Sequence, residues 1–245
     1  MRLPVHVTYR RRRRHIGAAL RRLVVVLLLT ALLYLLLTTF LLGSVREGSV
    51  SMSPAIEPGD RLLVSPLTYG AHVPLTRLRM PALRTPERGE IAVVEARYLS
   101  PRSRGLALAE AFVGFVTGHY VTQVGRDRSP PRFLIKRIIG MPGDTVRMEG
   151  YRAQIRPAGA AEFVDEAALV PFSYTPTPGP ASAYEGDLPF GGSLDPLELG
   201  AGEYFVLGDN RAQSSDSRSW GPVPAERVLA RVLLRYAPLR RFGRP

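Results

Sequence analysis

A run of twenty residues without a charge, Leu23 to Leu42, places the strongest limit on how this chain can fold. A helix of this length, rising 1.5 Å per residue, is about 30 Å long, which matches the apolar thickness of a bilayer. Only Thr30, Tyr34 and the pair 38–39 interrupt its apolar character. The sequence therefore predicts a transmembrane helix over residues 23–42.

The segment before this run is strongly basic. Residues 1–22 contain eight arginines and no acidic residue, so they supply most of the formal net charge of +12. Arginine on one flank of a span favours the cytoplasmic side, which predicts a cytoplasmic basic segment over 1–22 and an extracytoplasmic domain over 43–245. We therefore expect a single-pass protein of the cytoplasmic (inner) membrane, with its N-terminus in the cytoplasm.

Two other interpretations of this region fit less well. The apolar part of a cleavable secretory signal is about 7–15 residues long and ends at small residues. This run is longer, and Gly43-Ser44-Val45 matches such a cleavage site poorly. Nucleic-acid binding is disfavoured because the basic cluster is the flank of a span and no pattern of alternating aromatic and basic residues follows it.

The composition excludes several kinds of chemistry. There is no cysteine, so the chain cannot form a disulfide, use a thiolate nucleophile or bind a metal through sulfur. Four histidines are scattered along the chain and lack the spacing of metal ligands. We expect no metal and no cofactor.

The chain contains a single lysine, Lys136, and it lies in the apolar run from Phe133 to Ile139. An arginine stays protonated at any accessible pH, whereas a buried lysine can lose its proton and act as a base. Lys136 is therefore a candidate general base. The alternative is a structural lysine that stands in a strand by chance.

A serine lies in a turn just beyond the predicted span. Residues 48–60 are rich in small residues, proline and Gly-Asp, which is typical of tight turns. Ser51 lies nine residues after Leu42, so its chemistry would take place near the membrane surface. A serine hydroxyl becomes a good nucleophile when a neighbouring base takes its proton. No histidine lies in a comparable context, which leaves Lys136 as the base.

Short apolar runs alternate with turns rich in glycine and proline after the span, and this pattern favours an all-β domain. Two stretches depart from it and are expected to be insertions. One, near 97–131, is compatible with a short helix, a strand pair or a surface that dips into lipid. The other, near 151–203, is rich in proline and is expected to form a β-rich subdomain. The expected strands include parts of 61–64, 88–95, 132–139, 204–207 and 227–236, the last as a strand or a short helix.

Three motifs follow the predicted span one after another. They are Ser51-Met52-x-Pro54 with Gly59-Asp60, Lys136-Arg137 with Gly140-x-Pro142-Gly143-Asp144, and Gly208-Asp209-Asn210-Arg211 with Ser214-x-Asp216-Ser217-Arg218-x-Trp220-Gly221. In this order they resemble the successive boxes of bacterial type I signal peptidases, the leader peptidase family of Ser/Lys serine proteases. The resemblance covers the chain from the anchor to about Tyr236, apart from the two insertions. It implies a signal-peptidase-type, all-β catalytic domain behind one N-terminal transmembrane helix, and an enzyme that removes signal peptides from exported preproteins.

The resemblance also implies roles for residues at matched positions. Ser51 resembles the nucleophile and Lys136 the general base. Ser49 matches the serine whose hydroxyl helps to bind the oxyanion. Ser214 matches the serine that hydrogen-bonds and orients the lysine amine. Asp216 and Arg218 match a paired acid and base that brace the site.

An extended substrate is expected to add as a strand beside the segments that lead to the serine and the lysine. Pockets lined by Met52, Leu134 and Ile135 would favour small residues at the first and third positions before the cut. The sequence departs from the family pattern at two places. Val50 stands where the family often has glycine, and Leu134 where it often has an aromatic residue.

Several related functions remain alternatives. A Ser/Lys autoprotease of the repressor-cleaving type shares the dyad, but the predicted span and the Gly-Asp-Asn-Arg motif argue against it. A maturation peptidase of the pilin or conjugative-transfer type has the same chemistry and stays open. A catalytically inactive membrane-anchored scaffold is disfavoured by the intact dyad. The expected partners are signal-peptide-bearing preproteins, the phospholipid bilayer and the secretion translocon.

Overall fold

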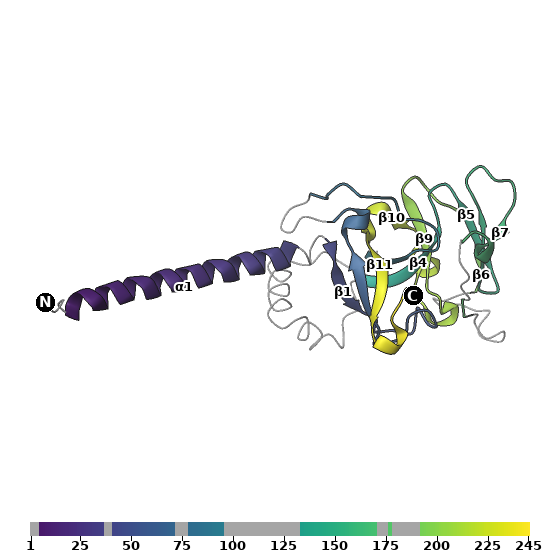
Figure 1. Ribbon diagram of the computed structural model, residues 1–245. Helices are drawn as coiled ribbons and strands as arrows, with labels where there is room; N and C mark the ends of the chain where they lie inside the picture. Colours follow the sequence, from purple (N-terminus) through teal and green to yellow (C-terminus); the bar gives the residue numbers. More distant parts are fainter. Residues whose placement is uncertain (1–4, 37–40, 72–77, 96–132, 171–175, 178–191) are drawn as a thin grey trace.

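The computed structural model describes the chain except for residues 1–4, 37–40, 72–77, 96–132, 171–175 and 178–191. It consists of a mostly β domain and a long helix, α1 (Val5–Leu36), which projects from one side of the domain (Figure 1). The helix continues through the boundary that we expected at residue 23. Among the residues that the structure describes, no helix combines the length and the apolar character needed to cross a bilayer.

A seven-stranded antiparallel sheet forms the larger part of the domain, with the strand order β1-β2-β11-β3-β4-β9-β10. Strand β11 pairs with β2 on one side and with β3 on the other, so it joins the first two strands to the rest of the sheet. The region around 227–236 is thus a strand and not a helix. The bounds are β1 (Gly43–Arg46), β2 (Arg61–Ser65), β3 (Ile91–Glu95), β4 (Phe133–Gly140), β9 (Glu203–Leu207), β10 (Val223–Pro224) and β11 (Val228–Ala237).

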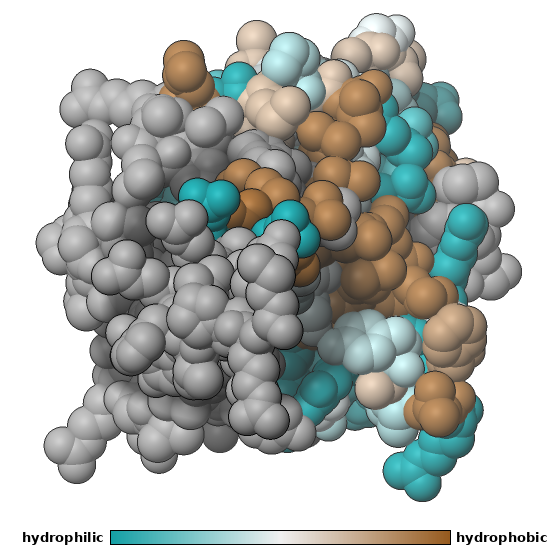
Figure 2. All heavy atoms as spheres, turned by 60° about the vertical axis from the view of Figure 1, so that its left-hand side comes forward, coloured by the Kyte–Doolittle hydropathy of each residue, from teal (hydrophilic) through white to brown (hydrophobic). Residues whose placement is uncertain are grey.

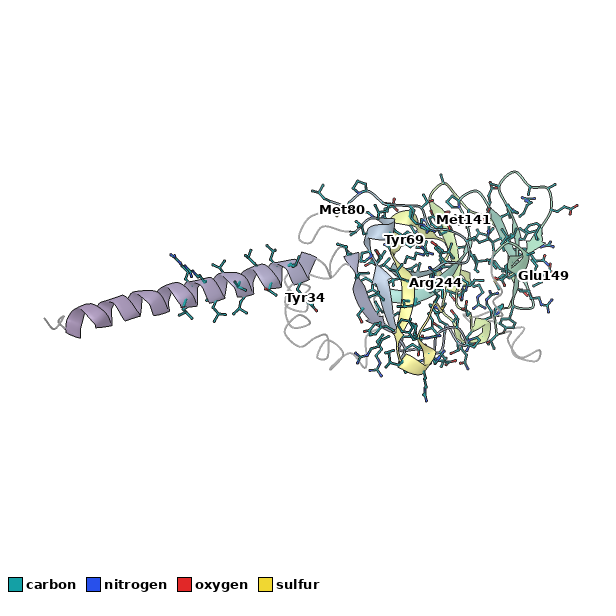
Figure 3. All side chains as sticks on the ribbon, in the orientation of Figure 1. Tyr34, Tyr69, Met80, Met141, Glu149 and Arg244 are labelled. Carbon is teal, nitrogen blue, oxygen red and sulfur yellow. The ribbon has the colours of Figure 1, made fainter. Side chains whose placement is uncertain are left out.

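A second, four-stranded sheet has the order β7-β6-β5-β8. It holds the described part of the expected insertion near 151–203, which is β-rich as predicted, although the sheet already begins with β5. Figure 3 places this sheet at the end of the molecule away from α1, as the labels of Glu149 and Tyr34 show. The insertion expected near 97–131 lies outside the described residues. The bounds are β5 (Thr145–Glu149), β6 (Arg152–Arg156), β7 (Val164–Asp165) and β8 (Leu194–Glu198).

Strand β4 lies at the centre of the domain, because its residues from Ile135 onward are all buried. Neighbouring side chains of a strand point to opposite faces, so β4 contributes to core clusters on both sides of the sheet. Ile135 packs in one cluster with β2 and β3, and Ile138 packs in another with β9 and β10. Ile139 packs against the second sheet. The apolar run around the lone lysine is therefore buried on both faces.

The chain leaves β4 through the Pro142-Gly143-Asp144 turn that the sequence predicted. Gly143 has φ of +84°, a left-handed conformation that favours glycine. The Asp144 carboxylate closes the turn, since Oδ2 accepts a hydrogen bond from the Met141 N–H at 2.6 Å and another from Arg88 at 2.9 Å. Short helical turns complete the fold at η2 (Leu67–Tyr69), η4 (Glu166–Ala168), η5 (Arg211–Gln213), α3 (Ser217–Trp220), η6 (Ala225–Arg227) and η7 (Leu239–Arg241).

Candidate active site

Ser51 and Lys136 are in contact although 85 residues separate them in sequence. Ser51 lies in the turn between β1 and β2, and Lys136 lies on β4. The Nζ of Lys136 donates a hydrogen bond to the Oγ of Ser51 at 2.8 Å. Lys136 is only 2% exposed and Ser51 only 6%. The fold thus brings the serine and the lysine that the sequence selected into one buried contact.

Burial lowers the pKa of Lys136 below its ordinary value of 10.5, and this desolvation is the largest influence on the group. The carboxylates of Asp216, Glu47 and Asp209 raise the pKa of Lys136, and the Arg218 guanidinium lowers it. A lysine with a lowered pKa can be neutral and accept a proton from a neighbouring hydroxyl. The environment of Lys136 is therefore suited to a general base.

Ser49 lies beside the Ser51 hydroxyl. The two Oγ atoms are 3.0 Å apart, and the Ser51 N–H points to the Oγ of Ser49 at 3.4 Å. The hydroxyl of Ser49 donates to Oε1 of Glu47 at 2.7 Å. The hydroxyl of Ser49 and the backbone N–H of Ser51 therefore lie next to each other, and their role as oxyanion donors stays a prediction. The sequence motifs gave no role to Glu47, because only the fold directs its side chain to Ser49.

The turn that carries Ser51 is held from the C-terminal side of the domain. The carboxylate of Asp60 closes this turn and lies 3.4 Å from Arg235 of β11 and 3.2 Å from Arg241. Arg235 also donates to the carbonyl oxygen of Ala55 at 2.7 Å. Residues far apart in the sequence therefore fix the backbone that presents the serine.

The loop over residues 208–211 packs against the Ser51 turn from another side. The N–H of Asn210 donates to the carbonyl oxygen of Ser51 at 3.0 Å. A Cβ atom at Gly208 would lie 2.5 Å from the same oxygen and 2.2 Å from the Oγ of Ser214. Only glycine allows this close approach, which explains why the motif requires it.

Ser214 lies next to this loop, and its hydroxyl is fully buried. Within the part of the chain that the structure describes, its Oγ has no hydrogen-bond partner. The expected hydrogen bond between Ser214 and Lys136 is therefore not formed in this structure, where the lysine amine donates to Ser51. The hydroxyl of Ser214 can rotate about its C–O bond, and a buried hydroxyl is stabilised when it forms a hydrogen bond. The role of Ser214 in orienting the Lys136 amine therefore stays a prediction.

Asp216 and Arg218 form a buried ion pair. Nε and Nη2 of Arg218 donate to the two carboxylate oxygens of Asp216 at 2.8 and 2.9 Å. Arg218 also donates to the carbonyl oxygens of Arg211 and Ser214, at 2.7 and 3.2 Å. The Asp216 carboxylate accepts the N–H of Gly208 at 3.1 Å. The pair thereby fastens the backbone next to the dyad.

Two further buried ion pairs support the site. Arg137 binds both carboxylate oxygens of Asp209, at 2.8 and 2.6 Å, and both residues are 2% exposed. Arg211 binds both carboxylate oxygens of Glu166 at 2.6 Å. The sequence motifs contain three of these residues but do not show which pairs form. Glu166 belongs to the second sheet region and no motif marks it.

The three residues expected to line the substrate pockets do not share one surface. Met52 is fully buried and Ile135 is 5% exposed, and both belong to the same core cluster. Leu134 packs on the other cluster, because adjacent strand residues point to opposite faces. Their role in lining the substrate pockets stays a prediction. Val50, 42% exposed, and Phe133, 49% exposed, are the accessible apolar side chains near the serine and the lysine in sequence.

A buried lysine amine in contact with a serine hydroxyl is the arrangement of a Ser/Lys dyad, here on an antiparallel β domain. Within the described residues, no group of histidine, aspartate and glutamate side chains could hold a metal ion. The family model described as "Signal peptidase, peptidase S26" matches residues 20–237, and the chain belongs to this family.

Individual relatives carry related names. A "Probable signal peptidase I-2" of Synechocystis sp. is 30% identical over 195 residues, which cover 80% of this chain and 63% of that protein. A "Signal peptidase I" of Leptolyngbya laminosa is 29% identical, over 80% of this chain and 68% of that protein. This chain thus spans less than two thirds of the length of the Synechocystis protein. A crystal structure of a signal peptidase I from Enterococcus faecalis aligns at 21% identity over 62% of this chain and 99% of that chain, with a TM-score of 0.32.

Proposed function

We propose that this protein is a membrane-bound serine endopeptidase, a type I signal peptidase that cleaves N-terminal signal peptides from exported preproteins. Membership of the signal peptidase family supports this function. The observation that carries it is the 2.8 Å contact between the amine of Lys136 and the hydroxyl of Ser51. Burial of the lysine supports its use as a base, since desolvation lowers the pKa of Lys136.

In the proposed mechanism, the neutral Nζ of Lys136 accepts the proton of Ser51, and the serine Oγ attacks the carbonyl carbon of the scissile peptide bond. The Ser51 N–H and the Ser49 hydroxyl bind the oxyanion. The Lys136 ammonium then protonates the leaving amine as the C–N bond breaks, which gives an acyl-enzyme. A water molecule gives a proton to Lys136 as it attacks the ester, and Ser51 regains its proton as the second product leaves.

The remaining site residues have supporting roles in this proposal. Ser214 orients the lysine amine once its hydroxyl rotates toward it. The ion pair of Asp216 with Arg218 fixes the loop that contacts the serine turn, because it binds backbone groups on both sides of that loop. The substrate adds as an extended strand through main-chain hydrogen bonds, and small side chains are selected near the cut.

The proposal includes a single span over residues 23–42 with the N-terminus in the cytoplasm. The uncharged run and its arginine flank support it. Leucine and valine side chains of α1 are exposed, and Figure 2, which brings the α1 side forward, shows hydrophobic side chains among hydrophilic ones in the centre and right of the visible face. Met80, labelled on the α1 side in Figure 3, is among the exposed apolar residues of the domain. We infer that the partners are preproteins, the phospholipid bilayer and the secretion translocon.

Incubation of the purified chain with a preprotein tests this function. The wild type should release the mature protein, and Ser51→Ala should leave the preprotein intact while the fold is retained. Complementation of a strain depleted of signal peptidase tests the same activity in cells. A wild-type chain that neither cleaves nor complements would exclude the proposal.

The membrane arrangement has its own test. Protease added to intact spheroplasts should digest the domain that follows the span and leave residues 1–22 protected. Protection of the β domain instead would exclude the proposed orientation.

A further inference from the structure

Glu47 is a buried acidic residue at the serine turn to which the mechanism above gives no task. It is 6% exposed. Its backbone is fixed on both sides, since its N–H donates to the Asp60 carbonyl at 3.0 Å and its own carbonyl accepts the N–H of Gly59 at 2.8 Å. The side chain of Glu47 is therefore directed into the site by a backbone that has little freedom.

The carboxylate of Glu47 binds Ser49 twice. Its Oε1 accepts the Ser49 N–H at 2.8 Å and the Ser49 hydroxyl at 2.7 Å. That hydroxyl has one proton, and its other neighbour, the Oγ of Ser51, is farther away at 3.0 Å. Hydrogen bonds to a carboxylate are shorter and stronger than those to a neutral oxygen. The Ser49 hydroxyl is therefore held in one orientation beside Ser51 by its hydrogen bond to Glu47 before substrate arrives.

The negative charge of Glu47 also raises the pKa of Lys136, the proposed base. Three acidic side chains raise the pKa of Lys136, and two of them have arginine partners: Asp216 pairs with Arg218 and Asp209 pairs with Arg137. In the described parts of the chain, Glu47 forms no ion pair. Of the three acidic side chains, Glu47 is thus the one whose charge no guanidinium of the described residues pairs with.

We propose that Glu47 is a positioning residue of the catalytic site: its carboxylate fixes the Ser49 hydroxyl and sets the pH at which the Ser51/Lys136 dyad becomes competent. The kinetic half of this inference rests on the proposed peptidase function. The electrostatic half concerns Lys136 alone and can be measured without any substrate.

The size of the effect follows from the contacts. Three steps of 2.7, 3.0 and 2.8 Å lead from Glu47 through the two serines to the Lys136 amine, so the charges are at most about 8.5 Å apart. At that separation, with effective dielectric constants between those of water and of a protein surface, the charge of Glu47 should shift the titration midpoint of Lys136 by about 0.4–1.4 pH units. Because a negative charge favours the ammonium form, removing it should lower the pH at which Lys136 loses its proton.

The lone lysine makes this shift directly observable. The full chain produced with ¹³C-labelled lysine contains one labelled side chain, whose resonance reports the titration of Lys136. Glu47→Gln should lower the midpoint by about 0.4–1.4 pH units. Glu47→Leu removes the same charge and suits a buried position, so either neutral variant can carry the test if the other fails to fold.

Glu57→Gln is the matched control. Glu57 lies in the same turn and accepts a hydrogen bond from Ser53 at 2.9 Å, but it is not among the groups that shift the pKa of Lys136. Its neutralisation should leave the midpoint unchanged. An equal midpoint in the wild type and in a folded neutral variant of Glu47 would overturn the electrostatic half.

Kinetics separate the hydrogen bond from the charge. The acid limb of kcat/KM should move to lower pH in both neutral variants. Glu47→Leu should lower the plateau kcat by roughly two- to tenfold, the worth of one hydrogen bond. Glu47→Gln keeps an oxygen acceptor for Ser49 and should lower the plateau kcat less than Glu47→Leu does. Equal plateaus in the two variants would overturn the positioning of Ser49. A wild type that cleaves no preprotein would refute the proposed function, and the titration would still decide the electrostatic half.

Discussion

Replacement of Glu166 by alanine should both destabilise the protein and weaken catalysis. Glu166 lies in η4, in the region of the second sheet, and both its carboxylate oxygens accept hydrogen bonds of 2.6 Å from Arg211. Both side chains are almost fully buried, at 4% and 0% exposure. Hydrogen bonds to charged groups are worth about 1.5–3 kcal/mol each, and breaking a buried ion pair costs about 3–5 kcal/mol. We therefore expect Glu166→Ala to lower the free energy of unfolding by about 3–5 kcal/mol.

The effect should reach the dyad because Arg211 belongs to the loop that touches the serine turn. Its Nε donates to the carbonyl of Gly208 at 3.1 Å, and the neighbouring Asn210 N–H binds the carbonyl of Ser51 at 3.0 Å. Loss of the carboxylate loosens this loop, so kcat should fall even at temperatures where the variant is folded. We therefore expect the second sheet to affect catalysis through this loop.

Thermal unfolding and preprotein cleavage measure the two effects. For a domain of this size the expected loss corresponds to a decrease of the unfolding midpoint of about 6–20 °C. Glu149→Ala is the control, since that glutamate of the same sheet is 68% exposed and lies 3.9 Å from Arg147, a surface pair worth about 0–1 kcal/mol. If Glu166→Ala unfolds at the same temperature as Glu149→Ala, the ion pair between Glu166 and Arg211 does not stabilise the contact between η4 and the loop over residues 208–211.

Four shorter predictions concern the Ser51/Lys136 dyad and the two serines beside it. Lys136→Arg should reduce cleavage to background with the fold intact, because a guanidinium cannot act as the base; a rate near wild type would exclude the Ser/Lys mechanism. Ser49→Ala should lower kcat by about 10²–10³-fold, the usual loss for one oxyanion donor, and an unchanged kcat would remove Ser49 from that role. Ser214→Ala should lower turnover by part of the 10²–10⁴-fold typical of general-base catalysis. It should not lower stability, because this buried hydroxyl has no partner among the described residues; unchanged turnover would exclude an orienting role. Wild-type activity should rise with pH through a midpoint below 10.5, because burial lowers the pKa of Lys136 and only its neutral form accepts the serine proton; a pH–rate profile that falls over this range would contradict the assignment.

Local chemistry made much of the site predictable from sequence. The turn around Ser51 follows from its small residues, proline and glycine, and the strand around Lys136 follows from an apolar run that ends at Pro142-Gly143-Asp144. The contact between the serine and the lysine followed from a chemical requirement, since a serine nucleophile needs a base. The turn and the strand depend on residues that are neighbours in the sequence, and the serine–lysine contact depends on what the proposed chemistry requires.

The side-chain partners across the fold were not predictable in this way. Leu134 and Ile135 are neighbours in the sequence, but strand alternation sends them to different clusters. Glu47 and Glu166 bind Ser49 and Arg211 through contacts that exist only once separate segments pack together. A glutamate in a loop has the same local pattern whether it is solvated or buried, so its sequence context does not reveal its partner.

The position of β11 makes the contact between Ser51 and Lys136 depend on residues far beyond both in the sequence. Residues 228–237 are synthesised after every other strand of the main sheet, yet they lie between β2 and β3. The serine turn is attached to the β2 side and the lysine strand pairs with β3. Ser51 and Lys136 therefore lie on two parts of the sheet that β11 joins, so their contact depends on pairing by the strand that comes last in the sheet's sequence order.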